Sequence, residues 1–152
     1  MPKGKKKKSK KKSKSKDKIE RINTGIDGLD DLIEGGFVKG SSVLVMGGPG
    51  TGKTIMGYQF LNEGLENDES VLFVSLENTE KNMLAEAADF KFEFKDDKNF
   101  NFMHVELSKL AEQSDKYQDI ASNIIEEIIK EVEKNKAERI VIDSLTVFSL
   151  FL

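Results

Sequence analysis

Eight consecutive residues have the types and spacing needed to hold a chain of phosphates: Gly47-Gly48-Pro49-Gly50-Thr51-Gly52-Lys53-Thr54. They fit the pattern G-x-x-x-x-G-K-[ST], in which glycines let the backbone turn tightly and present N–H groups to phosphate oxygens. The Lys53 ammonium suits the β- and γ-phosphates, and the Thr54 hydroxyl is a hard oxygen ligand for Mg²⁺. The pattern predicts a nucleotide site formed by residues 47–54 together with Ile55 at the start of the following helix. A plain glycine-rich turn is the structural alternative, but it does not explain the Lys and the Thr.

Two acidic residues could complete this site. Asp143 ends the apolar run Arg139-Ile140-Val141-Ile142, where a partner for Mg²⁺ is expected to hold the metal through its water shell. Glu77 directly follows the apolar run 71–76, at the carboxyl edge where an open α/β sheet builds its site. A carboxylate there could polarise the water that attacks the γ-phosphate. It could equally be an acid at the start of a helix, where it favours the helix dipole.

Strands and helices must alternate to position these residues. Apolar runs predict buried strands at 42–46, 71–76, 100–105 and 139–145, and helical periodicity predicts helices at 54–65, 79–89 and 117–136. Helical spacing also extends over Ile26, Leu29, Leu32 and Ile33, and Gly35-Gly36 ends that segment. We expect Met83, Leu84, Ala87 and Ala88 to face inward from the helix at 79–89. The alternation predicts a three-layer α/β domain with a mostly parallel sheet.

The net charge of −3 conceals two opposed parts. Residues 1–18 contain 11 Lys and one Asp, whereas the remainder contains 13 basic and 26 acidic residues. The Lys-rich tail cannot bury apolar surface, so we predict that residues 1–18 are disordered. The tail could bind nucleic acid or an anionic membrane surface, or it could only solubilise the chain or fold back on the acidic body. No apolar stretch is long enough to span a membrane, and the absence of Cys fits a cytoplasmic, reducing environment.

The aromatic residues and the single histidine offer weaker signals. Phe90, Phe92 and Phe94 alternate, which could indicate a base-stacking platform, but ordinary packing is favoured because no basic residues interleave usefully. His104 has no second His or Cys with which to share a metal, so we predict a packed or surface histidine.

Several of these segments together resemble a known family. Residues 22–32, Gly35-Gly36, Lys39-Gly40 and the loop at 47–54 resemble the opening of the KaiC-like ATPases of the RecA superfamily. Residues 73–77 and 139–145 resemble the catalytic-glutamate and Walker B stretches of that family, so the resemblance covers about residues 19–150. It implies a RecA-like P-loop NTPase core, ATP as ligand, Mg²⁺ as cofactor, and a homo-oligomeric ring or filament. It also implies that Glu77 is the water-activating carboxylate.

The sequence departs from that family in three respects, one of which is that the Phe-rich stretch at 90–102 lacks the expected glycine-aromatic-acid pattern. The family usually carries two adjacent acids after the second strand, whereas here Asn78 follows Glu77, as in the recombinase branch. The family's domain also continues beyond Walker B, with a strand that lies between the Walker B and phosphate-loop strands, a polar sensor and a basic finger. The chain ends at Leu152. We therefore expect a partial domain over residues 19–152, a truncated product or a fragment, with the C-terminal strands missing. The strands at 42–46 and 139–145 would then have unpaired edges, or would have to pair with each other in a register that the family does not use.

Three functions are open at this point. The first is a KaiC-like regulatory or signalling ATPase. The second is a recombinase-like DNA-dependent ATPase, which the basic tail and the single Glu77 mildly favour. The third is a nucleotide-binding adaptor without turnover, which the missing finger and sensor favour. Whether ATP is hydrolysed is the question that separates the third from the other two.

Overall fold

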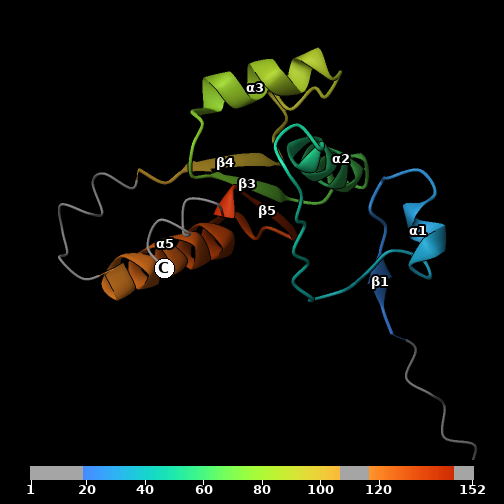
Figure 1. Cartoon of the computed structure of the whole chain (residues 1–152), viewed down its shortest axis with the longest axis horizontal. Coiled ribbons are helices and arrows are strands. Elements are labelled where there is room, and N and C mark those ends of the chain that lie inside the picture. Colours follow the sequence, from blue (N-terminus) through green and yellow to red (C-terminus); the bar gives the residue numbers. More distant parts are fainter. Residues whose placement is uncertain (1–18, 107–116, 146–152) are drawn as a thin grey trace, which may run out of the picture.

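Three parallel strands form the central sheet in the computed structural model, which describes residues 19–106 and 117–145. β3 (Val71–Ser75) lies between β4 (Phe100–His104) and β5 (Arg139–Asp143), as Figure 1 shows. The register pairs Ser75 with both His104 and Asp143, so the carboxyl ends of all three strands lie at one edge. All of β3 is buried because strands flank it and helices cover both faces. These three predicted strands are confirmed.

The helices cover the two faces of this sheet. α2 (Lys53–Glu66) and α3 (Glu80–Asp89) lie on one face and α5 (Tyr117–Asn135) on the other (Figure 1). The first core contains Tyr58, Leu61, Val71, Phe73, Met83, Ala87 and Phe94. The second core contains Leu72, Val74, Leu76, Val105, Ile120 and Ile124. The alternating residues of β3 enter opposite cores, which confirms the predicted three-layer α/β architecture.

Aromatic side chains fill the first core. The Tyr58 ring lies 5.6 Å from Phe73 and 5.8 Å from Phe94, and the ring centroids of Phe94 and Phe100 are 4.9 Å apart. Phe94 is 1% exposed, whereas Phe90 is 53% exposed. Apart from Phe90, these rings pack against one another in the interior, so the packing interpretation is confirmed over the base-stacking one.

The N-terminal segment is less helical than its periodicity predicts. Only α1 (Leu29–Leu32) is helical, and Leu32 is 82% exposed. The helix ends because the chain must return to pair β2 (Phe37–Val38) antiparallel with β1 (Arg21–Ile22), and Glu34, Gly35 and Gly36 all have positive φ. Helical spacing of four apolar residues was therefore a misleading signal, since the turn that closes this hairpin determines the local structure.

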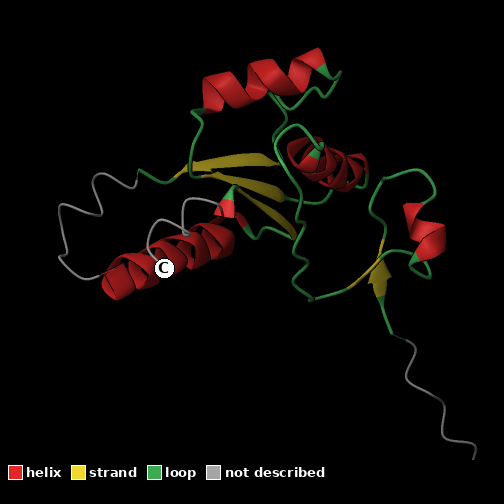
Figure 2. Cartoon of the chain, in the orientation of Figure 1, coloured by secondary structure: helices red, strands yellow, loops and turns green. Residues whose placement is uncertain are grey.

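The predicted buried strand at 42–46 is wrong. This stretch has no regular secondary structure and is drawn as a loop in Figure 2, with Leu44 67% exposed and Met46 82% exposed. A strand needs a neighbour to satisfy its backbone N–H and C=O groups. Among the described residues β5 pairs only with β3, so its outer edge is unpaired, and residues 42–46 pair with no strand. The expected unpaired edge of β5 is confirmed within this part of the chain.

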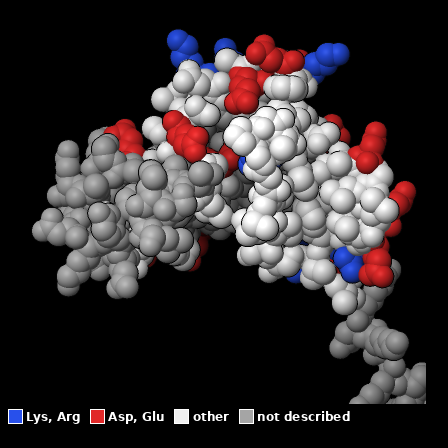
Figure 3. Space-filling view, in the orientation of Figure 1, with Lys and Arg blue, Asp and Glu red and all other residues white. Residues whose placement is uncertain are grey.

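Charge on the described surface is mixed. In Figure 3, acidic side chains are spread over the visible face, while Lys and Arg lie mainly over α3 and at the lower right. The described atoms of this face form no continuous basic patch. The Lys-rich segment 1–18 lies outside the described residues, so its disorder and its binding role stay predictions. No helix in the described ranges is long and apolar enough to cross a membrane.

Candidate nucleotide-binding site

The predicted phosphate-binding loop leads directly into α2. Gly50 and Gly52 have φ of 72° and 86°. Gly52 is the N-cap residue of α2, and no side chain forms a capping hydrogen bond there. A Cβ on Gly47 would lie 2.6 Å from the Thr51 Oγ1 atom, so the loop closes too tightly for a larger residue there. The first-turn N–H groups of α2 have no intrahelical partners, and they provide donors for an anion.

Lys53 folds back over its own loop. Its Nζ atom donates to the carbonyl oxygens of Gly47 and Gly48, at 3.0 and 2.9 Å. The Thr51 hydroxyl donates to the Gly48 oxygen at 2.9 Å, and Gly47 to Gly52, including Pro49, are exposed. Ile55 is half-buried and its side chain packs against the first core. The loop is therefore braced from within while its outer surface is open to solvent.

Thr54 contacts Asp143, its predicted acidic partner, which lies 89 positions later in the sequence. Its hydroxyl donates to the Asp143 Oδ2 atom at 2.6 Å. α2 can lie this close to β5 because residue 57 is a glycine, where a Cβ would be 2.9 Å from the Val141 Cγ1 atom. The two residues predicted to serve Mg²⁺ are thus brought into direct contact at the carboxyl edge of the sheet.

Glu77 lies at the same edge, just beyond the end of β3. The Leu76 N–H donates to the Asp143 carbonyl at 3.1 Å, so the turn carrying Glu77 begins beside Asp143. The buried Ser75 hydroxyl accepts the N–H groups of Asn78, at 2.8 Å, and Glu77, at 3.4 Å. The Ser144 hydroxyl donates to the Glu77 Oε1 atom. The structure therefore holds Glu77 close to the Thr54–Asp143 pair.

Sequence reasoning missed Arg139, which it placed only as the start of a strand. Arg139 is 3% exposed and its guanidinium donates to the Glu69 carboxylate, to the Asn23 carbonyl at 2.6 Å and to the Phe60 carbonyl at 3.1 Å. The guanidinium also lies 4.7 Å from the centroid of the Phe60 ring. Arg139 thereby joins the N-terminal segment, α2 and β5. The only signal in the sequence was a charged residue at the start of an otherwise apolar run.

A second link joins α2 to α3. The Tyr58 hydroxyl donates to the Glu86 Oε2 atom at 3.2 Å. Burial raises the pKa of Tyr58, and the Glu86 carboxylate raises it further, so the phenol stays protonated and keeps donating. Tyr58 is part of α2, which follows the phosphate-binding loop, so this bond helps to fix α2 beneath the site.

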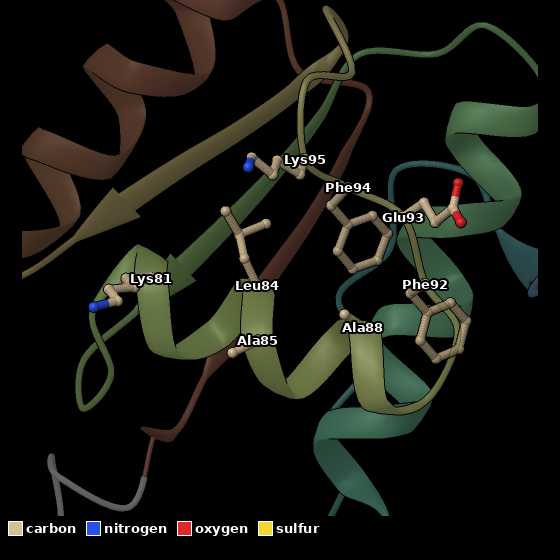
Figure 4. A pocket seen from close by; sticks show the side chains of 8 residues that line it. All are labelled: Lys81, Leu84, Ala85, Ala88, Phe92, Glu93, Phe94 and Lys95. Atoms are coloured by element: carbon tan, nitrogen blue, oxygen red, sulfur yellow. The ribbon is translucent and has the colours of Figure 1, made fainter.

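A shallow hollow of about 480 Å³ lies away from these residues, between α3 and the segment that follows it (Figure 4). It is lined by Lys81, Leu84, Ala85, Ala88, Phe92, Glu93, Phe94 and Lys95. Ala88, predicted to face inward, is exposed and lines this hollow because it lies at the edge of the helix face that packs on the sheet. None of the predicted nucleotide-binding residues lines it, so the candidate site is the open loop surface.

Within the described ranges, no cluster of three or more His, Cys, Asp and Glu could hold a metal. His104 is exposed at the end of β4, as expected. The Thr54–Asp143 pair does fit Mg²⁺, because this ion takes hard oxygen ligands, binds through one or two carboxylates and phosphates, and keeps several waters. The Thr54 oxygen retains lone pairs for a metal while its proton is donated to Asp143.

Comparisons with known proteins identify the family to which this chain is similar. A family model described as "ATPase: KaiC" matches residues 22–151. The chain is 35% identical over 139 residues to the circadian clock oscillator protein KaiC of Parasynechococcus marenigrum, covering 85% of this chain and 26% of that protein. A UPF0273 protein of Thermotoga maritima is 34% identical over 139 residues, with 84% of this chain and 57% of that protein covered.

The fold is likewise similar to a solved structure. The crystal structure of a KaiC-like protein from the hyperthermophilic archaeon Pyrococcus horikoshii has a TM-score of 0.73 and 32% sequence identity. The match covers 89% of this chain and 58% of that one. The chain thus spans about a quarter of the KaiC relative and a little over half of the shorter relatives.

Proposed function

Because the chain belongs to the KaiC family of ATPases, we propose that it binds ATP with Mg²⁺ at the loop 47–54 and hydrolyses it. The observation that carries the proposal is the 2.6 Å hydrogen bond between Thr54 and Asp143, which joins the two halves of the site. The two residues meet because α2 packs closely against β5, with Gly57 lying beside the Val141 side chain.

The phosphates would be held by backbone donors and by one cation. The N–H groups from Gly50 to Ile55 surround the N-terminus of α2, where the helix dipole also favours negative charge. Lys53, now bonded to two loop carbonyls, would exchange these neutral acceptors for phosphate oxygens, which form stronger, charge-assisted bonds. Mg²⁺, held by Thr54 directly and by Asp143 through water, would neutralise charge on the phosphates.

Glu77 would act on the attacking water. In this step the water oxygen bonds to the γ-phosphorus, the bond from that phosphorus to the β–γ bridging oxygen breaks, and the water proton passes to the Glu77 carboxylate. ADP and phosphate leave, and Glu77 returns the proton to solvent. Its place at the sheet edge beside Asp143 supports this role.

The proposed biological role follows from one relative and from the residues around Glu77. One relative is named as a circadian clock oscillator protein, and we propose a regulatory ATPase that works in an assembly with other copies of the chain. A second candidate is a recombinase-like ATPase, because Glu77 is followed by Asn78 and not by a second acid. In that case the Lys-rich tail would bind nucleic acid. This second candidate would be favoured if DNA accelerates phosphate release and if removal of residues 1–18 abolishes that acceleration.

Replacing Thr54 tests the metal part of the proposal. Thr54→Ala should weaken binding of ATP by roughly 10- to 100-fold with Mg²⁺ present and change it little when EDTA removes the metal. Thr54→Ser keeps the hydroxyl and should bind like the wild type. Isothermal titration calorimetry measures the ATP affinity of the wild type and of both variants. Equal affinity of the Ala variant and the wild type in Mg²⁺ would contradict the assignment of Thr54.

A further inference from the structure

The carboxylate of Glu77 is held by a residue from the neighbouring strand. Glu77 lies just beyond β3 and Ser144 just beyond β5, 67 positions later, where the Ser144 hydroxyl donates to Oε1. The register pairs Ser75 with Asp143, so the residues beyond the two strand ends lie over the same part of the sheet edge. The contact therefore follows from the register of β3 and β5.

The backbone of Glu77 is fixed separately. The Ser75 hydroxyl is 2% exposed and accepts the N–H groups of Glu77 and Asn78, which shapes the turn after β3. Two serines from adjacent strands thus constrain the same residue, Ser75 through its backbone and Ser144 through its carboxylate. The Glu77 side chain is exposed, so a water molecule can reach its other carboxylate oxygen, Oε2.

From this arrangement we propose that Ser144 is a positioning residue for hydrolysis. By donating to Oε1 it sets the rotation of the Glu77 carboxylate and directs Oε2 toward the water. This inference rests on the proposed function, because it assigns a partner to the same carboxylate. The bond joins half-buried Ser144 to exposed Glu77, and a hydrogen bond from a hydroxyl to a carboxylate is charge-assisted and therefore stronger than a neutral one.

A double-mutant cycle on the turnover number tests the proposal. Ser144→Ala should lower the kcat for ATP about tenfold while KM stays within about twofold, because the carboxylate loses orientation and the nucleotide loses no contact. Ser144→Thr keeps the hydroxyl and should recover most of the turnover. In a Glu77→Gln background Ser144→Ala should cause no further loss, since the oriented base is already absent. Thermal unfolding checks that each variant is folded.

The outcomes separate the inference from the function beneath it. Wild-type kcat in Ser144→Ala, next to a strongly impaired Glu77→Gln, overturns the role of Ser144 alone. Equal losses from Ser144→Ala in both backgrounds also overturn it, because the effect would then not act through Glu77. If Glu77→Gln turns over ATP like the wild type, the proposed hydrolysis by Glu77 fails and the role of Ser144 fails with it.

Discussion

Replacing Glu77 by Gln should lower ATP turnover by roughly 10²- to 10⁴-fold, the contribution typical of a general base. Gln has nearly the same shape and can still accept a hydrogen bond from Ser144, but it cannot take the proton of the attacking water. Affinity for Mg-ATP should stay within about twofold, because the variant removes an interaction of the transition state only. Phosphate release at saturating Mg-ATP and calorimetric binding measure the two quantities.

Glu80→Gln is the matched control for this variant. Glu80 starts α3, is exposed, and lies three positions after Glu77, so it tests whether any acid near this helix start affects turnover. We expect full activity in Glu80→Gln. Equal losses in the two variants would favour an acid that acts only on the helix dipole. Unchanged turnover in Glu77→Gln would contradict the general-base role and would favour the nucleotide-binding adaptor.

Replacing Arg139 by Ala should lower the free energy of unfolding by about 3–5 kcal/mol, because a buried guanidinium is removed together with its ion pair to the half-buried Glu69 carboxylate. The Glu69 carboxylate would lose its partner, and the backbone carbonyls of Asn23 and Phe60 would lose their donors. Chemical unfolding in urea, followed by circular dichroism, measures the change.

Two further variants make this result specific. Arg139→Lys keeps the charge but loses the planar, branched set of donors, so its stability should fall between those of the wild type and the Ala variant. Lys39→Ala breaks the Lys39–Glu20 ion pair, in which both side chains are well exposed, and should leave the urea midpoint unchanged. A loss below about 1 kcal/mol in Arg139→Ala would contradict the central role of this side chain.

Elements with a strong and continuous pattern were predictable from the sequence. β3 is an unbroken apolar run flanked by strands, and α2 has apolar residues at helical spacing, so in both the local pattern and the packing agree. The stretches at 26–33 and 42–46 also had apolar patterns, but their structure depends on distant segments. Residues 26–33 are shaped by the pairing of β1 with β2, and 42–46 could form a strand only with a neighbour beside it.

The residues of the site also fall into two groups, those with a local sequence pattern and those without one. The glycines of the loop, Lys53 and Thr54 form one local motif, and Asp143 and Glu77 were predicted because each ends an apolar run. Ser144 and Arg139 carry no comparable local signal. Their partners Glu77, Glu69 and Asn23 lie 67, 70 and 116 positions away. The parallel register of β3 and β5 brings the first two close, and the packing of the N-terminal segment brings the third.

Binding of Mg-ATP to the wild type and to Lys53→Ala tests the central claim most directly. We predict saturable, Mg²⁺-dependent binding to the wild type and a roughly 10- to 100-fold loss of affinity in the variant, since it removes charged hydrogen bonds to phosphate. Lys81→Ala, a lysine beside the hollow on α3, should bind like the wild type. Absence of saturable binding to the wild type, or equal affinity of wild type and Lys53→Ala, would contradict the account.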